Sequence, residues 1–161
     1  MSKRDPKNPR IVLEEDHRNI RALLDRLVAT VRADDREASA AAWVPLERTL
    51  LRHLDVEEMF VFPALTQSHP KEVEALLREH AALRREIGAI GLAFDLHAAR
   101  AEAIEGFCGT LREHAAREES LAYGQAEELL PVNVARAIVE RIGRLAAPRK
   151  RARGALAGAA F

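Results

Sequence analysis

Two short stretches of the chain repeat one pattern of side chains that can bind a metal ion. Residues 53–58 read HLDVEE and residues 114–119 read HAAREE, each a histidine followed after three residues by two glutamates. Imidazole nitrogens and carboxylate oxygens are donors that suit iron, manganese and zinc. Residues four apart on an α-helix project to the same side. The pairs His53 with Glu57 and His114 with Glu118 could therefore each contact one ion.

The elements that must carry these side chains are predicted to be helices. Apolar residues recur with helical periodicity in four long segments, and Ala, Leu, Arg and Glu favour helix. The four predicted helices extend over about residues 9–32, 35–65, 68–94 and 99–130, with Ser68 as the N-cap of the third. Short connections favour antiparallel neighbours. The prediction is an all-α, up-down-up-down four-helix bundle with a short fifth helix after Pro131.

Composition indicates one domain and limits the partners. We expect the bundle and fifth helix to occupy residues 1–147, and residues 148–161 to form a basic, flexible tail. The formal net charge is zero, so no nucleic acid or membrane partner is expected. No apolar stretch approaches the length of a membrane span. A single cysteine, Cys108, excludes an internal disulfide and suits the cytoplasm.

Distances from the turns place four histidines at one height in the bundle. His80 lies 17 residues before His97 (97 − 80), and His114 lies 17 residues after it (114 − 97). Similar counts about the other two turns bring His17 and His53 into the same layer. The second and fourth helices run in the same direction, so their two candidate glutamates share a neighbouring layer.

Four imidazoles and two carboxylates in one interior layer predict a dinuclear metal site. A single histidine on an apolar helix face is more often a core residue, but six ligand-type side chains converge here. The carboxylates would bridge two divalent ions and the imidazoles would fill terminal positions. Without thiolate, the donors suit iron or manganese, and zinc is possible. The predicted metal ligands are His17, His53, Glu57, His80, His114 and Glu118.

Four stretches of the chain resemble the hemerythrin-like, or HHE cation-binding, family over about residues 9–130. These stretches are EEDHRNI at 14–20, HLDVEEMFVFPAL at 53–65, REHAALR at 78–84 and REHAAREESLAYGQAEEL at 112–129. The resemblance implies a non-haem di-iron centre with two iron ions and an oxo or hydroxo bridge. Manganese or zinc is the less favoured metal. By position, the four histidines would be terminal ligands and the two glutamates would be carboxylate bridges.

The chain departs from the oxygen-carrying members of that family. Those members supply five histidines, with a His-x-x-x-His pair on the third helix, whereas Leu76 and Arg84 flank His80 here. Their second bridge is usually aspartate, whereas this chain has Glu118. The set looks more like bacterial HHE proteins linked to peroxide, nitric oxide or iron-centre repair. An open position on one iron would favour reactivity, unless a further ligand closes it.

The functional expectation is a di-iron protein that binds or reacts with O₂, NO or peroxide in oxidative or nitrosative stress. If it is an enzyme, the expected activity resembles that of a peroxidase or catalase, with the di-iron centre itself as the catalytic group. The alternatives are a non-enzymatic sensor or store of O₂ or iron, and an iron donor for repair of iron–sulfur centres. A redox partner, or docking of another protein through the C-terminal tail, is left open.

Acidic residues beside the candidate ligands are interpreted as their neighbours. Glu58 and Glu119 lie about 100° around the helix from the proposed bridges. They are expected to be surface charges or hydrogen-bond partners rather than ligands. Asp16, Glu79 and Glu113 each precede a candidate ligand. Ligand imidazoles need acceptors for their second nitrogen, but we expect these three side chains to be solvated.

The remaining side chains near the site are expected to pack. Tyr123 follows Glu118 by five residues, about 140° around an α-helix, so packing is favoured over a redox role. His69 and His97 fall in predicted turns and are not expected to bind metal. Four apolar residues are expected to wall the site and limit water: Phe60, Leu76, Leu77 and Leu83.

Overall fold

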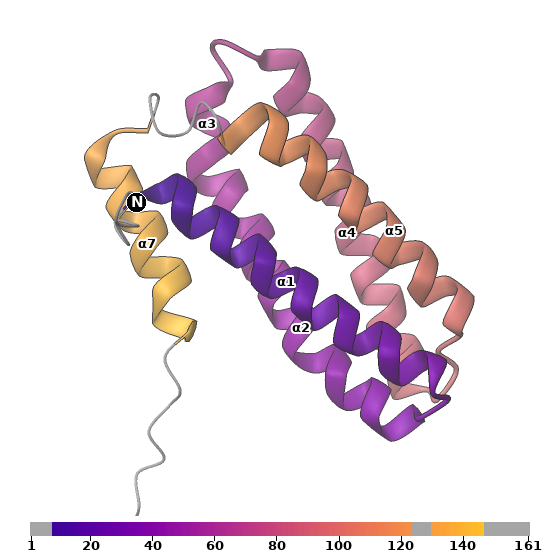
Figure 1. The fold of residues 1–161 in the computed structure, drawn as a ribbon. Coiled ribbons are helices and arrows are strands. Elements are labelled where there is room, and N and C mark those ends of the chain that lie inside the picture. Colours follow the sequence, from indigo (N-terminus) through magenta and orange to yellow (C-terminus); the bar gives the residue numbers. More distant parts are fainter. Residues whose placement is uncertain (1–7, 124–129, 147–161) are drawn as a thin grey trace, which may run out of the picture.

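The computed structural model describes residues 8–123 and 130–146, which contain helices and no strand. Four long helices form the bundle, and the predicted all-α class is confirmed (Figure 1). Tight turns over residues 33–35 and 96–100 reverse the chain between helices. The long helices are α1 Pro9–Arg32, α2 Arg36–Val56, α4 Pro70–Asp95 and α5 Ala101–Glu118. The shorter segments are η1 Glu57–Val61, α3 Phe62–Leu65, η2 Glu119–Tyr123 and α7 Val132–Ala146.

Helix ends follow local capping chemistry. The side-chain oxygen of Asn8 accepts a hydrogen bond from the backbone N–H of Arg10 at 2.9 Å, and Pro9 occupies the first helical position. The prediction of Ser68 as the N-cap of the third helix is wrong. Its hydroxyl donates to the carbonyl of Leu65 at 3.3 Å, so it completes the preceding turn. His69 occupies the N-cap position instead.

Two of the predicted helices are interrupted by a turn of π-helix at or directly after a candidate ligand. The second helix changes to η1 at Glu57, and the fourth changes to η2 at Glu119. A π-turn closes i→i+5 hydrogen bonds, so it holds one residue more than an α-turn. A side chain five residues on is therefore brought back towards the same side. Of the predicted fourth helix, residues 124–129 lie outside the described part.

The apolar core has two parts, and the candidate ligands lie between them. The part nearer the turns after α1 and α4 contains Trp43, Leu46 and Phe107. The other part contains Leu13 and Phe62, with Ile138 of α7 packed into it. Along α1 and α4 the candidate histidine falls between residues of the two parts: His17 lies between Leu13 and Ile20, and His80 lies between Leu76 and Leu83.

Helix α7 packs on the side of the bundle beside the start of α1. It lies against α1 and α2, close to the start of α1 (Figure 1). Its buried residues Ile138 and Ile142 join the same core part as Tyr123. The predicted fifth helix is thus present. The expected tail over residues 148–161 lies outside the described residues. No helix in the described part is long and apolar enough to cross a membrane.

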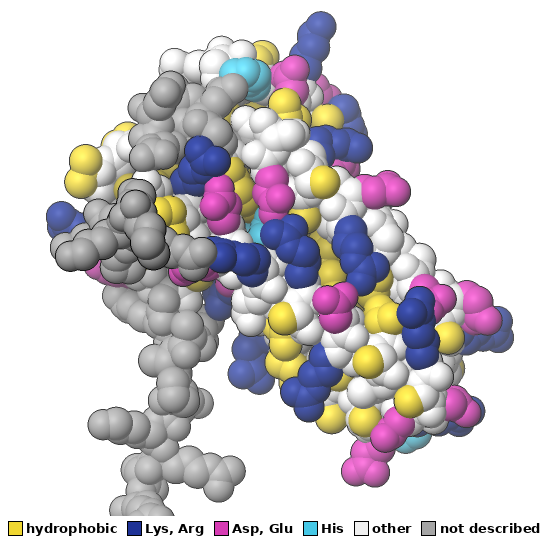
Figure 2. Space-filling view, in the orientation of Figure 1, with side chains coloured by type: hydrophobic (Ala, Val, Ile, Leu, Met, Phe, Trp, Pro, Cys, Tyr) yellow, Lys and Arg dark blue, Asp and Glu magenta, His cyan; other side chains and the backbone are white. Residues whose placement is uncertain are grey.

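The outer surface of the bundle is strongly charged. Figure 2 shows Lys and Arg side chains interspersed with Asp and Glu side chains over the helices on the face in view. Several of these charges form ion pairs between helices, such as Arg112 with Asp25 at 3.1 Å. Exposed pairs of this kind contribute little to stability. The apolar interior is therefore the main support for the buried polar layer.

Candidate metal centre

The side chains of all six predicted ligands meet at one level of the bundle. They come from four directions, one from α1, two from α2 and η1, one from α4 and two from α5. Each is at most 4% exposed although each is polar or ionisable. Burying such groups is costly unless they are paired or bind a metal. The residues are His17, His53, Glu57, His80, His114 and Glu118.

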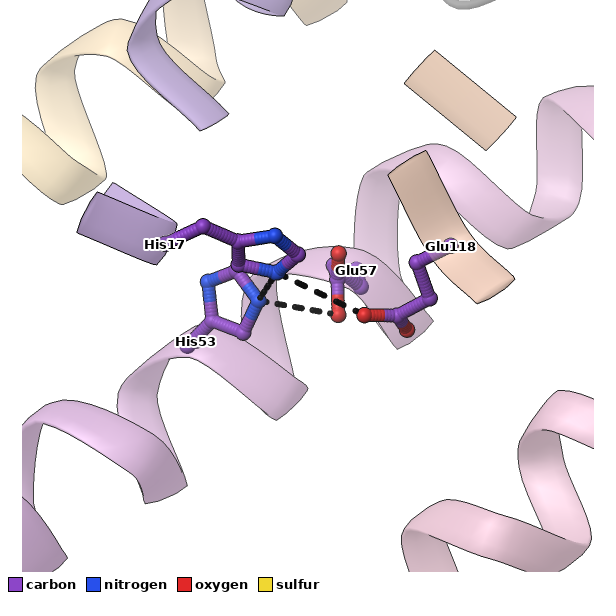
Figure 3. Close-up of side chains that lie close together, drawn as sticks. All are labelled: His17, His53, Glu57 and Glu118. Atoms are coloured by element: carbon purple, nitrogen blue, oxygen red, sulfur yellow. Dashed lines mark hydrogen bonds and ion pairs between the residues drawn. The ribbon is translucent and has the colours of Figure 1, made fainter. Parts of the chain in front are cut away.

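The six side chains form two overlapping groups with the geometry of ion sites. In one group, His17 and His53 join Glu57 and Glu118, as Figure 3 shows. In the other, His80 and His114 join the same two glutamates. Within each group the potential ligand atoms all lie within 4.8 Å of one another. Two cations could therefore be held side by side, with both carboxylates shared between them.

The Nε2 atom of each imidazole faces a shared carboxylate. His53 Nε2 lies 3.3 Å from Glu57 Oε2, and His17 Nε2 lies 3.5 Å from Glu118 Oε2. On the other side, Nε2 of His80 and of His114 lie 3.1 and 3.0 Å from Glu118 Oε1. The imidazoles thus present the same nitrogen to the centre of the bundle.

The Nδ1 atom of each imidazole faces outwards to a second carboxylate. This bond fixes the tautomer that carries its proton on Nδ1 and leaves a lone pair on Nε2 for a metal ion. The four contacts are His17 with Glu119 at 2.9 Å, His53 with Asp16 at 3.0 Å, His80 with Glu58 at 2.9 Å and His114 with Glu79 at 2.8 Å.

These contacts correct part of the sequence interpretation. Glu58 and Glu119 are hydrogen-bond partners of candidate ligands, which is one of the two roles expected for them. Asp16 and Glu79 are not simply solvated, because each accepts from a candidate ligand on a neighbouring helix. Glu113 is exposed, as expected. Each carboxylate that accepts an Nδ1 hydrogen bond comes from a neighbouring helical segment. Residue spacing along a single helix does not reveal which carboxylate pairs with which histidine.

Several buried atoms of the cluster are placed to bind a cation. Nε2 of His17 and Nε2 of His53 lie 2.9 Å apart, so two lone pairs face one another when both Nδ1 atoms carry the proton. Among the described residues, Oε2 of Glu57 and Oε2 of Glu118 have no hydrogen-bond partner. Unsatisfied buried acceptors are costly, and a divalent ion on each side would coordinate them. The residues present therefore fit a pair of metal ions.

The electrostatics of the cluster also favour positive charge. Burial alone would raise the pKa of Glu118, but interactions with the imidazoles of His114, His17 and His80 hold that pKa well below its usual range. Burial alone would lower the pKa of His53, but the charge of Glu57 and the bond to Asp16 raise it well above its ordinary value. In the metal-free protein, a positive charge on His53 thus partly balances the buried carboxylates.

Tyr123 lies in the cluster, which the sequence interpretation did not expect. Its hydroxyl donates to Glu57 Oε1 at 2.5 Å and lies 2.8 Å from Nε2 of His17. The π-turn η2 explains the difference, since it brings the residue five positions after Glu118 back towards the site. Burial and the nearby charges of Glu57 and Glu118 raise the pKa of Tyr123 well above its usual value, so the phenol keeps its proton.

Phe62 takes the equivalent place after the other π-turn. Its ring centroid lies 4.9 Å from that of His80, and the ring of Tyr123 lies 5.0 Å from that of His17. One aromatic ring therefore packs beside an imidazole on each side of the site. The sequence interpretation did not include Phe62 among the residues that wall the centre.

The four residues that were expected to wall the site have different environments. Leu76 and Leu83 are buried, and Phe60 is half-buried against the core part that contains Tyr123. Leu77 is 43% exposed, so the expectation for this residue is wrong. Leu77 follows Leu76 by about 100° on the helix and therefore faces solvent.

Comparison with known protein families agrees with this arrangement. Residues 8–152 match the family model described as the Hemerythrin HHE cation binding domain. No curated protein and no solved structure matches the chain.

Proposed function

The chain belongs to the hemerythrin HHE cation-binding family, and we propose that its buried cluster holds a di-iron centre that binds or reacts with O₂, NO or peroxide. One observation carries the proposal: two groups of buried ligand atoms share both Glu57 and Glu118. A site for one ion would not need a second, matched pair of histidines on the opposite side of the same carboxylates. We propose a role in oxidative or nitrosative stress on this basis.

The donor set supports iron. Four imidazoles and two carboxylates are nitrogen and oxygen donors of intermediate hardness, which suit iron and manganese and do not need thiolate. A structural zinc site would be closed around one ion by four ligands. When bound, a pair of iron ions can exchange two electrons with a small oxidant, one from each ion.

A small cavity borders the cluster. A cavity of about 200 Å³ borders His17, His53, His114 and Glu118. Its other lining is mostly apolar and includes Leu24, Leu50, Leu54 and Leu111. An apolar lining disfavours ordered water, and the volume is sufficient for a diatomic molecule or peroxide. The cavity therefore gives small ligands a place at the side of the site that His17 and His53 form.

Tyr123 holds one proton at a defined atom of the site. Its phenol keeps that proton because burial and the charges of Glu57 and Glu118 raise its pKa. The short bond to Glu57 Oε1 orients this carboxylate for its shared position. The oxygen of the same hydroxyl lies 2.8 Å from Nε2 of His17, so the phenol contacts two candidate ligands at once.

The function is tested by presenting O₂, NO and peroxide to the purified, iron-loaded protein. We expect either steady consumption of peroxide or a reversible change in the visible spectrum with O₂ or NO, and we expect it to depend on bound iron. The Glu118→Ala variant, exposed to the same free iron, should show neither. An iron-loaded protein that responds to none of the three ligands would overturn the proposal. Transfer of its iron to an apo iron–sulfur protein would then favour the role of iron donor.

A further inference from the structure

Each candidate ligand histidine is linked to an arginine through a carboxylate. The carboxylate accepts a hydrogen bond from Nδ1 of the histidine and also pairs with the arginine. Each unit is thus a histidine, an acidic side chain and an arginine in one chain of polar contacts. The four units are His17–Glu119–Arg21, His53–Asp16–Arg52, His80–Glu58–Arg84 and His114–Glu79–Arg117. Four repeats around one cluster are not expected from scattered surface ion pairs.

The four units are built alike. In each, the arginine lies on the same helix as its histidine, one, three or four residues away, and the carboxylate comes from a neighbouring element. The units join α1 to α2, α2 with η1 to α4, α4 to α5, and α5 with η2 back to α1. They therefore form a closed ring of cross-helix contacts around the six candidate ligands.

We propose that these arginines are positioning residues that set the charge around the metal centre, and that Arg52 is the strongest of them. The inference rests on the proposed di-iron function, because charge near the metal matters most to a centre that changes oxidation state. A guanidinium is always charged. It keeps its partner carboxylate ionised and oriented, and it competes with the imidazole for that carboxylate's electron density.

Burial singles out Arg52. Its side chain is 14% exposed and that of Asp16 is 4% exposed, whereas the other three arginines are 31–51% exposed. Water and salt screen exposed charges far more than buried ones. Among the described residues, Nε of Arg52 has no hydrogen-bond partner. A buried ion pair is weak support for stability, so stability alone is a poor reason for this pair.

The geometry gives the two partners of this pair opposite effects on the metal centre. Asp16 accepts from Nδ1 of His53 and makes that imidazole a stronger donor, which favours the oxidised centre. Arg52 binds the other oxygen of the same carboxylate and so weakens this effect. Its positive charge also favours the reduced centre, which carries less positive charge.

The reduction potential of the iron-loaded protein tests the proposal. We expect Arg52→Met to lower the potential and Asp16→Asn to raise it, with Arg52→Lys closer to the unchanged protein. Arg84→Met, at a more exposed pair, should lower the potential less than Arg52→Met does. The control is Arg32→Met. Arg32 is exposed and pairs with Glu105 at 2.8 Å between α1 and α5, but Glu105 has no contact with a candidate ligand histidine.

The outcomes separate this proposal from the function on which it rests. Shifts in the same direction for Arg52→Met and Asp16→Asn would indicate general loosening of the site and would overturn the role of the arginine. A shift for Arg32→Met as large as that for Arg52→Met would overturn it too. Absence of any redox couple in the unchanged, metal-loaded protein would instead overturn the di-iron function, and the role of Arg52 with it.

Discussion

Replacing Glu118 by alanine is expected to remove nearly all bound metal from the protein. Glu118 belongs to both groups of ligand atoms, and its two oxygens lie within 3.5 Å of three different histidines. Loss of a partner that only supports a ligand costs about 10- to 100-fold in metal affinity. Loss of a carboxylate shared by two ions should exceed about 100-fold on the same scale. Metal content after dialysis against a weak chelator measures the effect.

Two further variants sharpen this experiment. His53→Ala removes a donor from only one of the two groups, so one of the two ions should be lost more readily than the other. His69→Ala should leave the metal content unchanged, because this residue is the N-cap of α4 and belongs to neither group. Equal metal content in all three variants would contradict the assignment of the ligands.

Removing the metal is expected to lower the free energy of unfolding by about 3 to 4 kcal/mol for each ion that was present at 100 to 1,000 times its dissociation constant. The reason is that only the folded chain brings the six buried side chains together. For a chain of this length that change corresponds to roughly 10 °C in the melting temperature. Thermal or denaturant unfolding with and without chelator measures it. Unchanged unfolding after complete removal of metal would contradict a metal site in the folded core.

The pH dependence of this stabilisation has a definite sign. In the metal-free protein the pKa of His53 is raised well above, and that of His114 above, the ordinary value of 6.5. For both, burial is the largest single effect and lowers the pKa. Glu57 and Asp16 together outweigh it at His53, and Glu118, Glu79 and Glu57 together outweigh it at His114. A histidine whose pKa is raised in the folded state contributes its full stabilisation of the fold below about pH 6.5. This contribution is lost as the pH rises through the pKa of the folded state. Metal should therefore stabilise the protein more at pH 8.5 than at pH 6.5, which unfolding with and without metal at the two pH values would measure.

Much of the fold and the candidate ligand layer could be predicted from sequence because both follow from regular helix geometry. Apolar periodicity placed α1 and α4 within a few residues of their observed bounds. Counting from the turns placed His17, His53, His80 and His114 at one height, since rise per residue is constant in an α-helix. Neither step needed information about side-chain contacts between helices.

The prediction failed where helix geometry is irregular. Tyr123 was placed about 140° from Glu118 because an ideal α-helix was assumed, and η2 is a π-turn. A signal was present in the sequence. Residues 53–62 read HLDVEEMFVF and residues 114–123 read HAAREESLAY, so the repeat continues to an aromatic residue five positions after each candidate bridge. That extended repeat corresponds to the two π-turns.

The acceptors of the Nδ1 protons show a second limit. Glu79 precedes His80 in the chain but accepts from His114, and Asp16 precedes His17 but accepts from His53. Which helix faces which side chain depends on helix rotation and packing, and neighbours in sequence do not determine it. The arginines that pair with these carboxylates could not be identified from spacing along a single helix for the same reason.

The sharing of Glu57 and Glu118 between two metal ions is tested most directly by anomalous X-ray scattering at the iron absorption edge. Two peaks per chain are predicted, about 3.5–4 Å apart. One peak should lie beside His17 and His53 and the other beside His80 and His114. A single peak within one group of four ligands, or two sites that do not share the glutamates, would contradict the dinuclear centre.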